Sequence, residues 1–238
     1  MKSFSVYNSQ ESLIILHEDN HIVVVNKKSS EIVQGDKTGD KSIIEFVKDY
    51  IKEKYNKPGN VFCGLVHRLD RPTSGAIIFA RTSKALSRLN QQFRDRSINK
   101  VYWAVVEKKP EQKLGKLIHY LKKNTKQNKS HAFDKYVNES KEAILNYNWL
   151  ASSDNYHLLE IKLETGRHHQ IRCQLAHIGS VIKGDVKYGA KRANRDYSIH
   201  LHARKIIFEH PTKKEVISII APVPNDSLWK HFEEIIPT

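Results

Sequence analysis

Short apolar runs separated by polar turns recur along most of the chain and predict a strand-rich protein. Runs at 13–16 and 22–26 flank a polar turn at 18–20, and the runs at 61–66 and 76–80 flank a loop at 67–75. Other runs rich in β-branched and aromatic residues lie at 99–107, 143–150, 156–163, 201–208 and 215–221. Runs of this length and composition are typical of strands, and the last four predict two antiparallel hairpins.

Four stretches show helical spacing with plausible caps. Ser42 and Glu45 have the spacing of a capping box and precede apolar residues at helical intervals. Thr82 and Ser83 can cap a second helix, and Asp226 a short terminal one. The segment 165–179 has Thr165 as a possible cap and ends at a glycine, which predicts a helix there.

Two segments lack a clear pattern. Residues 27–40 predict a polar loop, and 108–141 is the least regular part of the chain. The second contains a basic run at 122–129, for which we expect a mobile loop or hairpin tip that embraces RNA, or simply a solvated face. No repeat, linker or domain boundary is evident, so we expect a single mixed α/β (α+β) domain over 1–238, with its core at about 13–222.

The net charge of the chain indicates what kind of partner it binds. The 238 residues carry 40 Lys and Arg against 26 Asp and Glu, a formal charge of +14. An excess of this size favours a polyanion, most often nucleic acid, although solubility alone is an alternative. Cys63 and Cys173 are far apart, which argues against a disulfide scaffold and fits a cytoplasmic protein. No apolar run is long enough to span a bilayer, and residues 1–4 do not resemble a secretion signal.

The loop at 67–75 is the first candidate for chemistry. Asp70 lies between Arg68 and Arg71, and nearby positive charge favours the ionised form of a carboxyl group. Such a carboxylate suits a nucleophile or a charge stabiliser better than a proton donor. Pro72 and Gly75 would fix the turn between two core strands. A surface turn in which Asp70 merely pairs with an arginine is the alternative.

The predicted helix after Thr165 is the second candidate. His169 and Arg172 are three residues apart and therefore share a helix face away from the apolar stripe. Arg167 lies where the helix begins, and free backbone N–H groups at a helix start favour anions.

Three separated motifs resemble those of the RluA-type pseudouridine synthases. They are H-R-L-D-x-x-T-S-G at 67–75, K-x-Y at 100–102 and T-G-R-x-H-Q-I-R at 165–172, supported by G-D-x-x-Y-G at 184–189 and L-H-A at 201–203. The resemblance implies a long, mostly antiparallel mixed sheet with flanking helices and a central cleft. It also implies isomerisation of uridines in RNA, without a metal or other cofactor.

The same resemblance assigns roles to individual residues. Asp70 corresponds to the family's nucleophile, Tyr102 to the tyrosine that stacks on the target base, and Arg172 to the arginine that pairs with the aspartate. Arg68 is expected to fill the gap left by an extruded nucleotide. We further expect RNA contacts from four residues, Arg71, Thr73, Arg167 and His169. Without the resemblance, Tyr102 could be a core aromatic and Arg172 a surface cation. The RNA would be ribosomal or transfer RNA, and the protein a cytoplasmic monomer.

The chain also departs from its relatives. Many have Asn-Lys-Pro-x-Gly after the second strand, whereas this chain has Asn26-Lys27-Lys28-Ser29-Ser30, which puts the loop's contribution to RNA contacts in doubt. Many also carry a small RNA-binding domain before the catalytic one, and only about a dozen residues precede Leu13, so we expect the catalytic domain to find its target unaided.

Two other functions compete with this assignment. One is a non-catalytic RNA-binding or ribosome-assembly protein on the same fold. The other is a metal-dependent nuclease built on Asp70 and histidines, namely His67, His168, His169 and His177.

Overall fold

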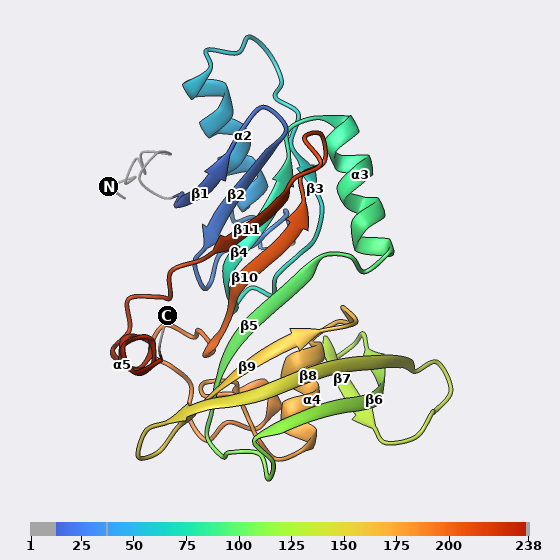
Figure 1. The fold of residues 1–238 in the computed structure, drawn as a ribbon, viewed down its shortest axis with the longest axis vertical. Helices are drawn as coiled ribbons and strands as arrows, with labels where there is room; N and C mark the ends of the chain where they lie inside the picture. Colours follow the sequence, from blue (N-terminus) through green and yellow to red (C-terminus); the bar gives the residue numbers. More distant parts are fainter. Residues whose placement is uncertain (1–12, 37, 237–238) are drawn as a thin grey trace.

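One large mixed sheet organises the molecule (Figure 1). The computed structural model describes residues 13–36 and 38–236. In this part of the chain the sheet has 11 strands in the order β1-β2-β4-β10-β5-β9-β8-β6-β7, with β3 also paired to β4 and β11 to β10. The sheet runs the length of the molecule, with β5 near its middle (Figure 1).

The strands are β1 Ile15–Glu18, β2 Ile22–Lys27, β3 Gly64–Leu65, β4 Ser74–Ala80, β5 Asn99–Val106, β6 Leu114–Asn124, β7 Lys129–Phe133, β8 Lys141–Ser152, β9 His157–Leu163, β10 Leu201–Glu209 and β11 Val216–Ile220. The helices are α2 Ile43–Lys54, α3 Ser83–Arg94, α4 Gln170–His177 and α5 Ser227–Ile235, with a short 3₁₀ turn, η1, at Val186–Tyr188.

The pairing of β4 with β10 is parallel, and the other strand pairs are antiparallel. This confirms the expected long, mostly antiparallel mixed sheet. Gly75 makes the parallel contact possible, since a Cβ there would lie 2.4 Å from the carbonyl oxygen of Ala203, and its φ of +116° also favours glycine. The close approach places the loop before β4 beside the start of β10, at the middle of the sheet.

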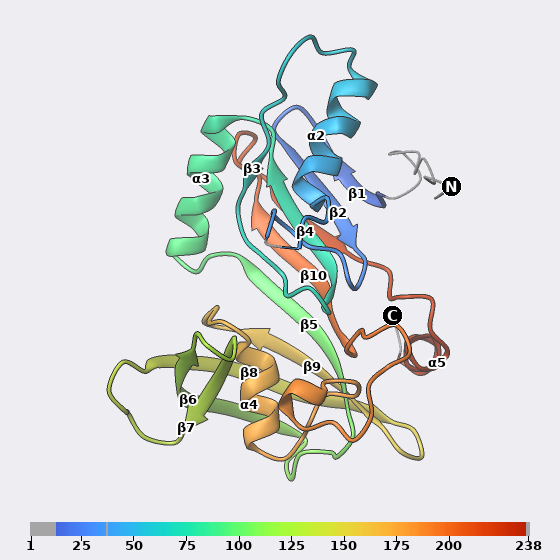
Figure 2. The same ribbon diagram turned by 180° about the vertical axis from the view of Figure 1, so that it is seen from behind.

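Side chains alternate between the two faces of the sheet, so each face buries its own apolar cluster. On β2, Val23 and Val25 face one cluster, which includes residues of α2 and α4, whereas Ile22 and Val24 face a second cluster with residues of α3. Helices α2 and α4 lie on the side turned toward the viewer in Figure 2. The terminal helix α5 packs Trp229 and Phe232 in a third cluster, against β5 and β9.

Local signals placed most helix starts correctly. Ser42 caps α2, and its backbone N–H donates to Glu45 Oε2 at 2.8 Å, which confirms the capping box. Thr82 Oγ1 accepts from the Ala85 N–H at 3.1 Å, and Asp226 caps α5. The expected cap at Thr165 is wrong. Helix α4 starts later, with His169 as its N-cap in a left-handed conformation (φ 53°), because a bend at 164–165 and a turn at 168–169 come before it.

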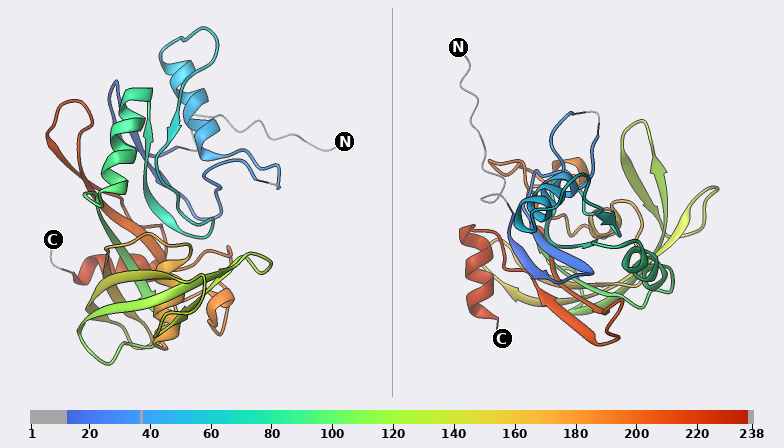
Figure 3. Two further views of the ribbon diagram at one scale, coloured as in Figure 1. Left: turned by 90° about the vertical axis from the view of Figure 1, so that its right-hand side faces the viewer. Right: turned by 90° about the horizontal axis from the view of Figure 1, so that it is seen from above.

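Two strand predictions need correction. The expected strand at 61–66 is reduced to the two residues of β3, which pair with the last two residues of β4. Residues 61–63 would lie opposite positions beyond the end of β4, and the Ile78 N–H donates to His67 Nε2 instead of to a backbone carbonyl. The expected irregular segment at 108–141 instead contains the β6–β7 hairpin, with residues 125–128 at its tip. The hairpin stands out from the body of the sheet (Figure 3), so the hairpin-tip alternative was the right one.

The expectation about the dozen residues before Leu13 concerns a segment outside the described residues. None of the described helices has the length and apolar character that crossing a bilayer requires.

Candidate active site

The loop that carries Asp70 is held by backbone hydrogen bonds to distant segments. The Thr73 N–H donates to the Asp70 carbonyl at 3.0 Å and closes a turn within the loop. The Ser30 N–H donates to Arg71 O at 2.9 Å, and the Ile199 N–H to Pro72 O at 3.2 Å. The loop is therefore fixed on both sides, as a catalytic side chain requires.

A buried lysine supports the same loop from beneath. Lys27 is 1% exposed, and its ammonium group donates to the carbonyls of Thr73 at 2.7 Å, Lys28 at 2.8 Å and Arg71 at 3.0 Å. Burial lowers the pKa of Lys27 to about 7, while Glu31 and Asp70 act in the opposite direction. Lys27 thus ties the end of β2 to the residues that follow Asp70.

Asp70 is joined to helix α4 through an arginine. Arg172 Nη1 donates to Asp70 Oδ2 at 3.1 Å, while its Nε and Nη2 donate to the two carboxylate oxygens of Asp185 at 2.7 and 2.8 Å. The side chains of Arg172 and Asp185 are 5% and 2% exposed, and that of Asp70 is 29% exposed. Burial alone would lower the pKa of Arg172, but the hydrogen bonds and charges of Asp185 and Asp70 raise it overall. A permanently charged guanidinium is therefore fixed by one carboxylate and presented to the other.

His169 lies against Asp70 as a neutral imidazole. Its Nε2 is 3.6 Å from Asp70 Oδ2, and its Nδ1 shares a hydrogen bond of 3.0 Å with the Tyr188 hydroxyl. Burial lowers the pKa of His169 to about 3, with Asp70 opposing this shift and Arg172 adding to it. The contact at 3.6 Å is thus not an ion pair near neutral pH, and Arg172 is the cation that meets Asp70.

Tyr102 lies on β5, on the face of the sheet that α4 covers. Its ring is 8% exposed and belongs to the apolar cluster of that face, yet it also lines the cleft that contains Asp70. Burial, with a smaller contribution from Asp70, raises the pKa of Tyr102. The ring is therefore an uncharged aromatic surface beside the carboxylate, held by core packing.

The cleft has a volume of about 770 Å³ and lies between the Asp70 loop, the 32–36 segment, β5 and the start of α4. Its lining contains seven lysine or arginine residues, Arg68, Arg71, Lys100, Lys123, Arg167, Arg172 and Lys187, and two aspartates, Asp36 and Asp70. The volume suits a nucleotide-sized ligand, and the excess of positive charge favours a polyanion.

The residues expected to contact RNA differ in their surroundings. Arg68 is exposed, lines the cleft, and is not paired with any carboxylate of the described residues. Arg71 pairs with Asp40 at 2.7 Å, and Arg167 Nε donates to Glu142 O at 2.9 Å. Thr73 is 2% exposed, and its buried hydroxyl has no hydrogen-bond partner among the described residues. Arg68 is thus the most available of these groups for a ligand.

The structure brings together only part of the residues of the nuclease hypothesis: His169 lies against Asp70 and stacks on His168, whereas His67 and His177 have other partners. His67 Nε2 accepts from the Ile78 N–H at 3.0 Å, its ring stacks on Phe93, and burial lowers its pKa to about 3. His177 lies at the far end of α4, 2.8 Å from Asp134. Within the described ranges, the side chains close enough to share a metal ion are those of His119, Asp134 and His177. Neither His67 nor Asp70 belongs to this group.

Comparison with known proteins decides the family. Residues 21–177 match the model of the RNA pseudouridylate synthase family. The chain belongs to this family. The synthase is accordingly an isomerase that converts uridine in RNA to pseudouridine, as the three motifs implied.

Relatives of the synthase span much of its length. It is 35% identical over 220 residues to ribosomal large subunit pseudouridine synthase C of Buchnera aphidicola subsp. Baizongia pistaciae, covering 88% of this chain and 67% of the relative. It is 31% identical over 243 residues to tRNA pseudouridine synthase C of Vibrio vulnificus, covering 93% and 94%. The solved structure of human RNA pseudouridylate synthase domain containing 4 shares the fold, with a TM-score of 0.76, 22% identity and 94% of each chain covered. These relatives are named for catalysis, and none supports the non-catalytic alternative.

Sequence reasoning missed three residues of the candidate site. Asp185 and Tyr188 both lie within the G-D-x-x-Y-G motif, which was noted only as support for the resemblance. Lys27 lies in the retained Asn-Lys pair of the altered Asn26–Ser30 segment. In each case the sequence motif could have pointed to the residue, but its contacts could not be predicted because they depend on the fold.

We predict that Lys27→Met destabilises the synthase by about 2 kcal/mol at pH 7 and lowers its turnover, because three loop carbonyls lose their donor. The folded-state pKa of Lys27, about 7, lies below its ordinary value of 10.5, so above pH 7 the unfolded chain binds a proton that the native state lacks. The Lys27 contribution to stability should therefore rise with pH above 7, by up to about 1.4 kcal/mol per pH unit.

Urea unfolding of the wild type and Lys27→Met between pH 7 and 8.5 measures both effects. The exposed neighbour Lys28 provides the control, and Lys28→Met should leave stability and its pH dependence unchanged. Equal pH slopes for the wild type and Lys27→Met would contradict the buried titration.

Proposed function

We propose that this synthase acts on ribosomal or transfer RNA with Asp70 as its nucleophile, Tyr102 as the stacking surface for the target base and Arg172 as the partner of the carboxylate. The observation that carries the proposal is the bond of 3.1 Å from Arg172 to Asp70 at the floor of a basic cleft that Tyr102 also lines. Relatives named for ribosomal RNA and for transfer RNA support the two substrate classes equally.

The chemistry needs few groups. The bond between ribose C1′ and uracil N1 breaks, a bond from C1′ to C5 forms, C5 loses a proton and N1 gains one, so the product is an isomer of the substrate. Asp70 attacks either C1′ or the pyrimidine ring, or assists glycal formation, and each role requires its ionised form. The guanidinium of Arg172 stabilises that form and orients it.

The target uridine must leave the RNA stack to reach Asp70. Extruding a base costs a few kcal/mol, and stacking on an aromatic ring returns about 1–3 kcal/mol. Tyr102 would supply the ring, and Arg68, which also lines the cleft, would occupy the gap in the RNA. Cations along the cleft contact phosphates on either side.

We further propose that the synthase works as a monomer in the cytoplasm. Cys63 and Cys173 are free thiols, which suits a reducing compartment. In each case burial raises the thiol pKa, to about 12, so both are unreactive.

Pseudouridine mapping across total RNA from cells with and without the gene tests the substrate. We expect one or a few uridines of ribosomal or transfer RNA to lose the modification when the gene is deleted and to regain it on complementation. Identical maps from the two strains would defeat the proposal.

A further inference from the structure

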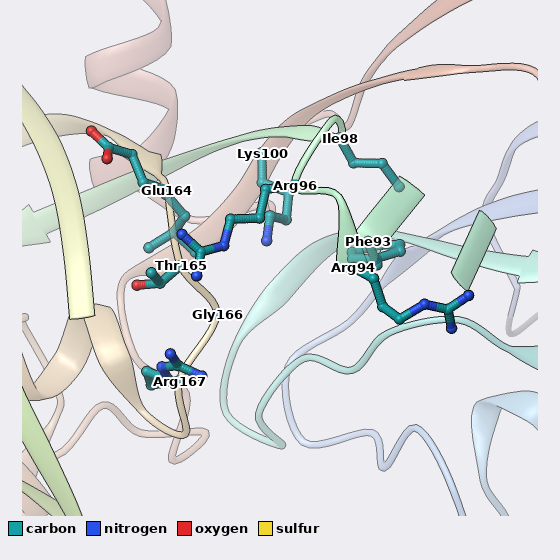
Figure 4. Close-up of a pocket in the computed structure, with 10 residues that line it drawn as sticks. Phe93, Arg94, Arg96, Ile98, Lys100, Glu164, Thr165, Gly166 and Arg167 are labelled. Atoms are coloured by element: carbon teal, nitrogen blue, oxygen red, sulfur yellow. The ribbon is translucent and has the colours of Figure 1, made fainter. Parts of the chain in front are cut away.

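A second cavity adjoins the active-site cleft. Its volume is about 310 Å³, and it is formed by the end of α3, the start of β5 and the connection from β9 to α4 (Figure 4). Five residues line both cavities, Phe93, Lys100, Leu163, Gly166 and Arg167. An RNA strand whose target uridine occupies the cleft can therefore continue into this second cavity.

The cavity carries an excess of positive charge. Four cations line it, Arg94, Arg96, Lys100 and Arg167, against the single carboxylate of Glu164. Glu164 is already bound, since it accepts from Asn146 Nδ2 at 2.8 Å and pairs with Lys116 at 2.9 Å. Figure 4 shows its carboxylate away from the Arg96 and Lys100 side chains, and the guanidinium of Arg94 pointing away from both. Arg96 and Lys100 are therefore the cations that a ligand would meet.

Lys100 is a partly buried ammonium group without a carboxylate partner among the described residues. Its ammonium group lies over the ring of Phe93, 5.6 Å from the ring centre. Burial lowers the pKa of Lys100. An anion in the cavity would restore the stability of the charged form.

Arg96 occupies a backbone position that favours glycine. It follows Asp95, the C-cap of α3, and has φ 57° in the left-handed region. Glycine is the common residue there, because a Cβ atom makes that conformation unfavourable. Its exposed guanidinium forms no ion pair within the described part of the chain, although its charge adds to the hydrogen bonds of Asn146 and Lys116 that lower the pKa of Glu164. Arg96 thus combines an unfavourable backbone conformation with an unpaired cation that lines the cavity. Unfavourable backbone conformations are common at ligand sites.

We propose that this cavity binds a backbone phosphate of the substrate RNA, next to the target uridine, through Arg96, Lys100 and Arg167. The inference rests on the proposed function, because it continues the strand held in the cleft. A volume of about 310 Å³ accommodates one nucleotide unit and excludes a duplex. The predominance of unpaired cations favours the phosphate over the base as the recognised group.

A structural role for Arg96 is the competing explanation. A cation near the end of α3 would complement the negative end of the helix dipole. In that case its removal would lower stability and leave RNA affinity unchanged. If Arg96 binds a phosphate, its removal should lower RNA affinity and leave stability unchanged.

Arg96→Gly distinguishes the two roles, since glycine relieves the backbone conformation and removes the charge. We expect unchanged or higher thermal stability and about tenfold weaker binding of a fluorescein-labelled oligouridylate at 100 mM salt. The slope of log affinity against log salt should fall in magnitude by about 0.7, the value for one phosphate contact on single-stranded nucleic acid. Arg96→Lys keeps the charge and should retain most of the affinity.

Lys214→Gly is the matched control. Lys214 is also basic and left-handed, with φ 65°, but it pairs with Glu209 and lines neither cavity. The Lys214→Gly variant should bind the oligonucleotide like the wild type. An equal loss of affinity in both variants would show that binding depends on net charge alone and would overturn the proposed phosphate site. Wild-type affinity and salt slope in Arg96→Gly would overturn it as well.

The two proposals fail separately. Oligouridylate binding requires no isomerisation, so it decides the phosphate site even if RNA mapping reveals no substrate. If mapping identifies a substrate and Arg96→Gly binds normally, the proposed function stands and the phosphate site does not.

Discussion

Asp70→Asn should abolish pseudouridine formation while leaving the protein folded and able to bind RNA. An amide oxygen can still accept from Arg172, so the geometry of the ion pair is nearly kept, but the amide is a poor nucleophile. We expect a loss of turnover of roughly 10⁴-fold or more, as for other enzymes that lose their nucleophile. Affinity for RNA should change little, because Asp70 adds no positive charge to the cleft.

The measurement is nucleoside mass spectrometry of a substrate RNA, combined with binding of the same RNA. Asp40→Asn is the matched control, since Asp40 also pairs with an arginine of the loop, Arg71, but is exposed and lines neither cavity. It removes the same charge and should keep full activity. Residual isomerisation by purified Asp70→Asn at more than about one hundredth of the wild-type rate would exclude Asp70 as the nucleophile.

Much of the fold could be predicted from local pattern. The caps at Ser42, Thr82 and Asp226 fixed three helix starts, because a capping side chain satisfies backbone donors within its own turn. Strand β5 was also predicted from its apolar and aromatic run. These signals are local, so they need no knowledge of the rest of the chain.

The misplaced elements depend on long-range pairing. Residues 61–66 have the composition of a strand, but only Gly64 and Leu65 pair with β4, whose last residue, Ala80, lies opposite Gly64. Strand β6 alternates weakly and is rich in lysine, so its membership of the sheet follows from pairing with β8 over Leu114–Leu121 rather than from its own apolar content. Where a partner strand ends cannot be read from the segment that pairs with it.

In the candidate site, too, some residues could be predicted from local motifs, whereas others depend on long-range contacts. Asp70, Tyr102 and Arg172 stand in recognisable motifs, and the expected pairing of Asp70 with Arg172 is present in the structure. Lys27 looked like part of a polar loop, because burial of an ammonium group under three carbonyls is a property of the assembled loop. Asp185 stood in a motif without an assigned role, since its partner lies on another element.

Asp185→Asn should have the second large effect, on both stability and catalysis. The substitution removes one carboxylate from a buried guanidinium whose other ion pair among the described residues is with the partly exposed Asp70, and whose remaining neighbour is the uncharged ring of Tyr188. Breaking a buried ion pair on one side costs about 3–5 kcal/mol. Arg172 would also lose one of the two bonds that set its orientation, because the amide NH2 of asparagine cannot accept from a guanidinium, and a misplaced group in an active site costs on the order of 10²-fold in rate. We expect turnover to fall and KM to change little, because Asp185 does not line the cleft.

A double variant separates the two effects. Arg172→Met with Asp185→Leu replaces the buried pair by apolar side chains of similar size, which is often neutral for stability. It should therefore recover most of the stability lost in Asp185→Asn, as measured by urea unfolding, but remain inactive, because Asp70 would have no cation beside it. Asp185→Asn with wild-type stability and turnover would contradict the role of Asp185, and an active double variant would contradict the role of Arg172. The predicted result would show that the buried pair is retained to position the cation that meets Asp70, since apolar packing can replace its contribution to folding.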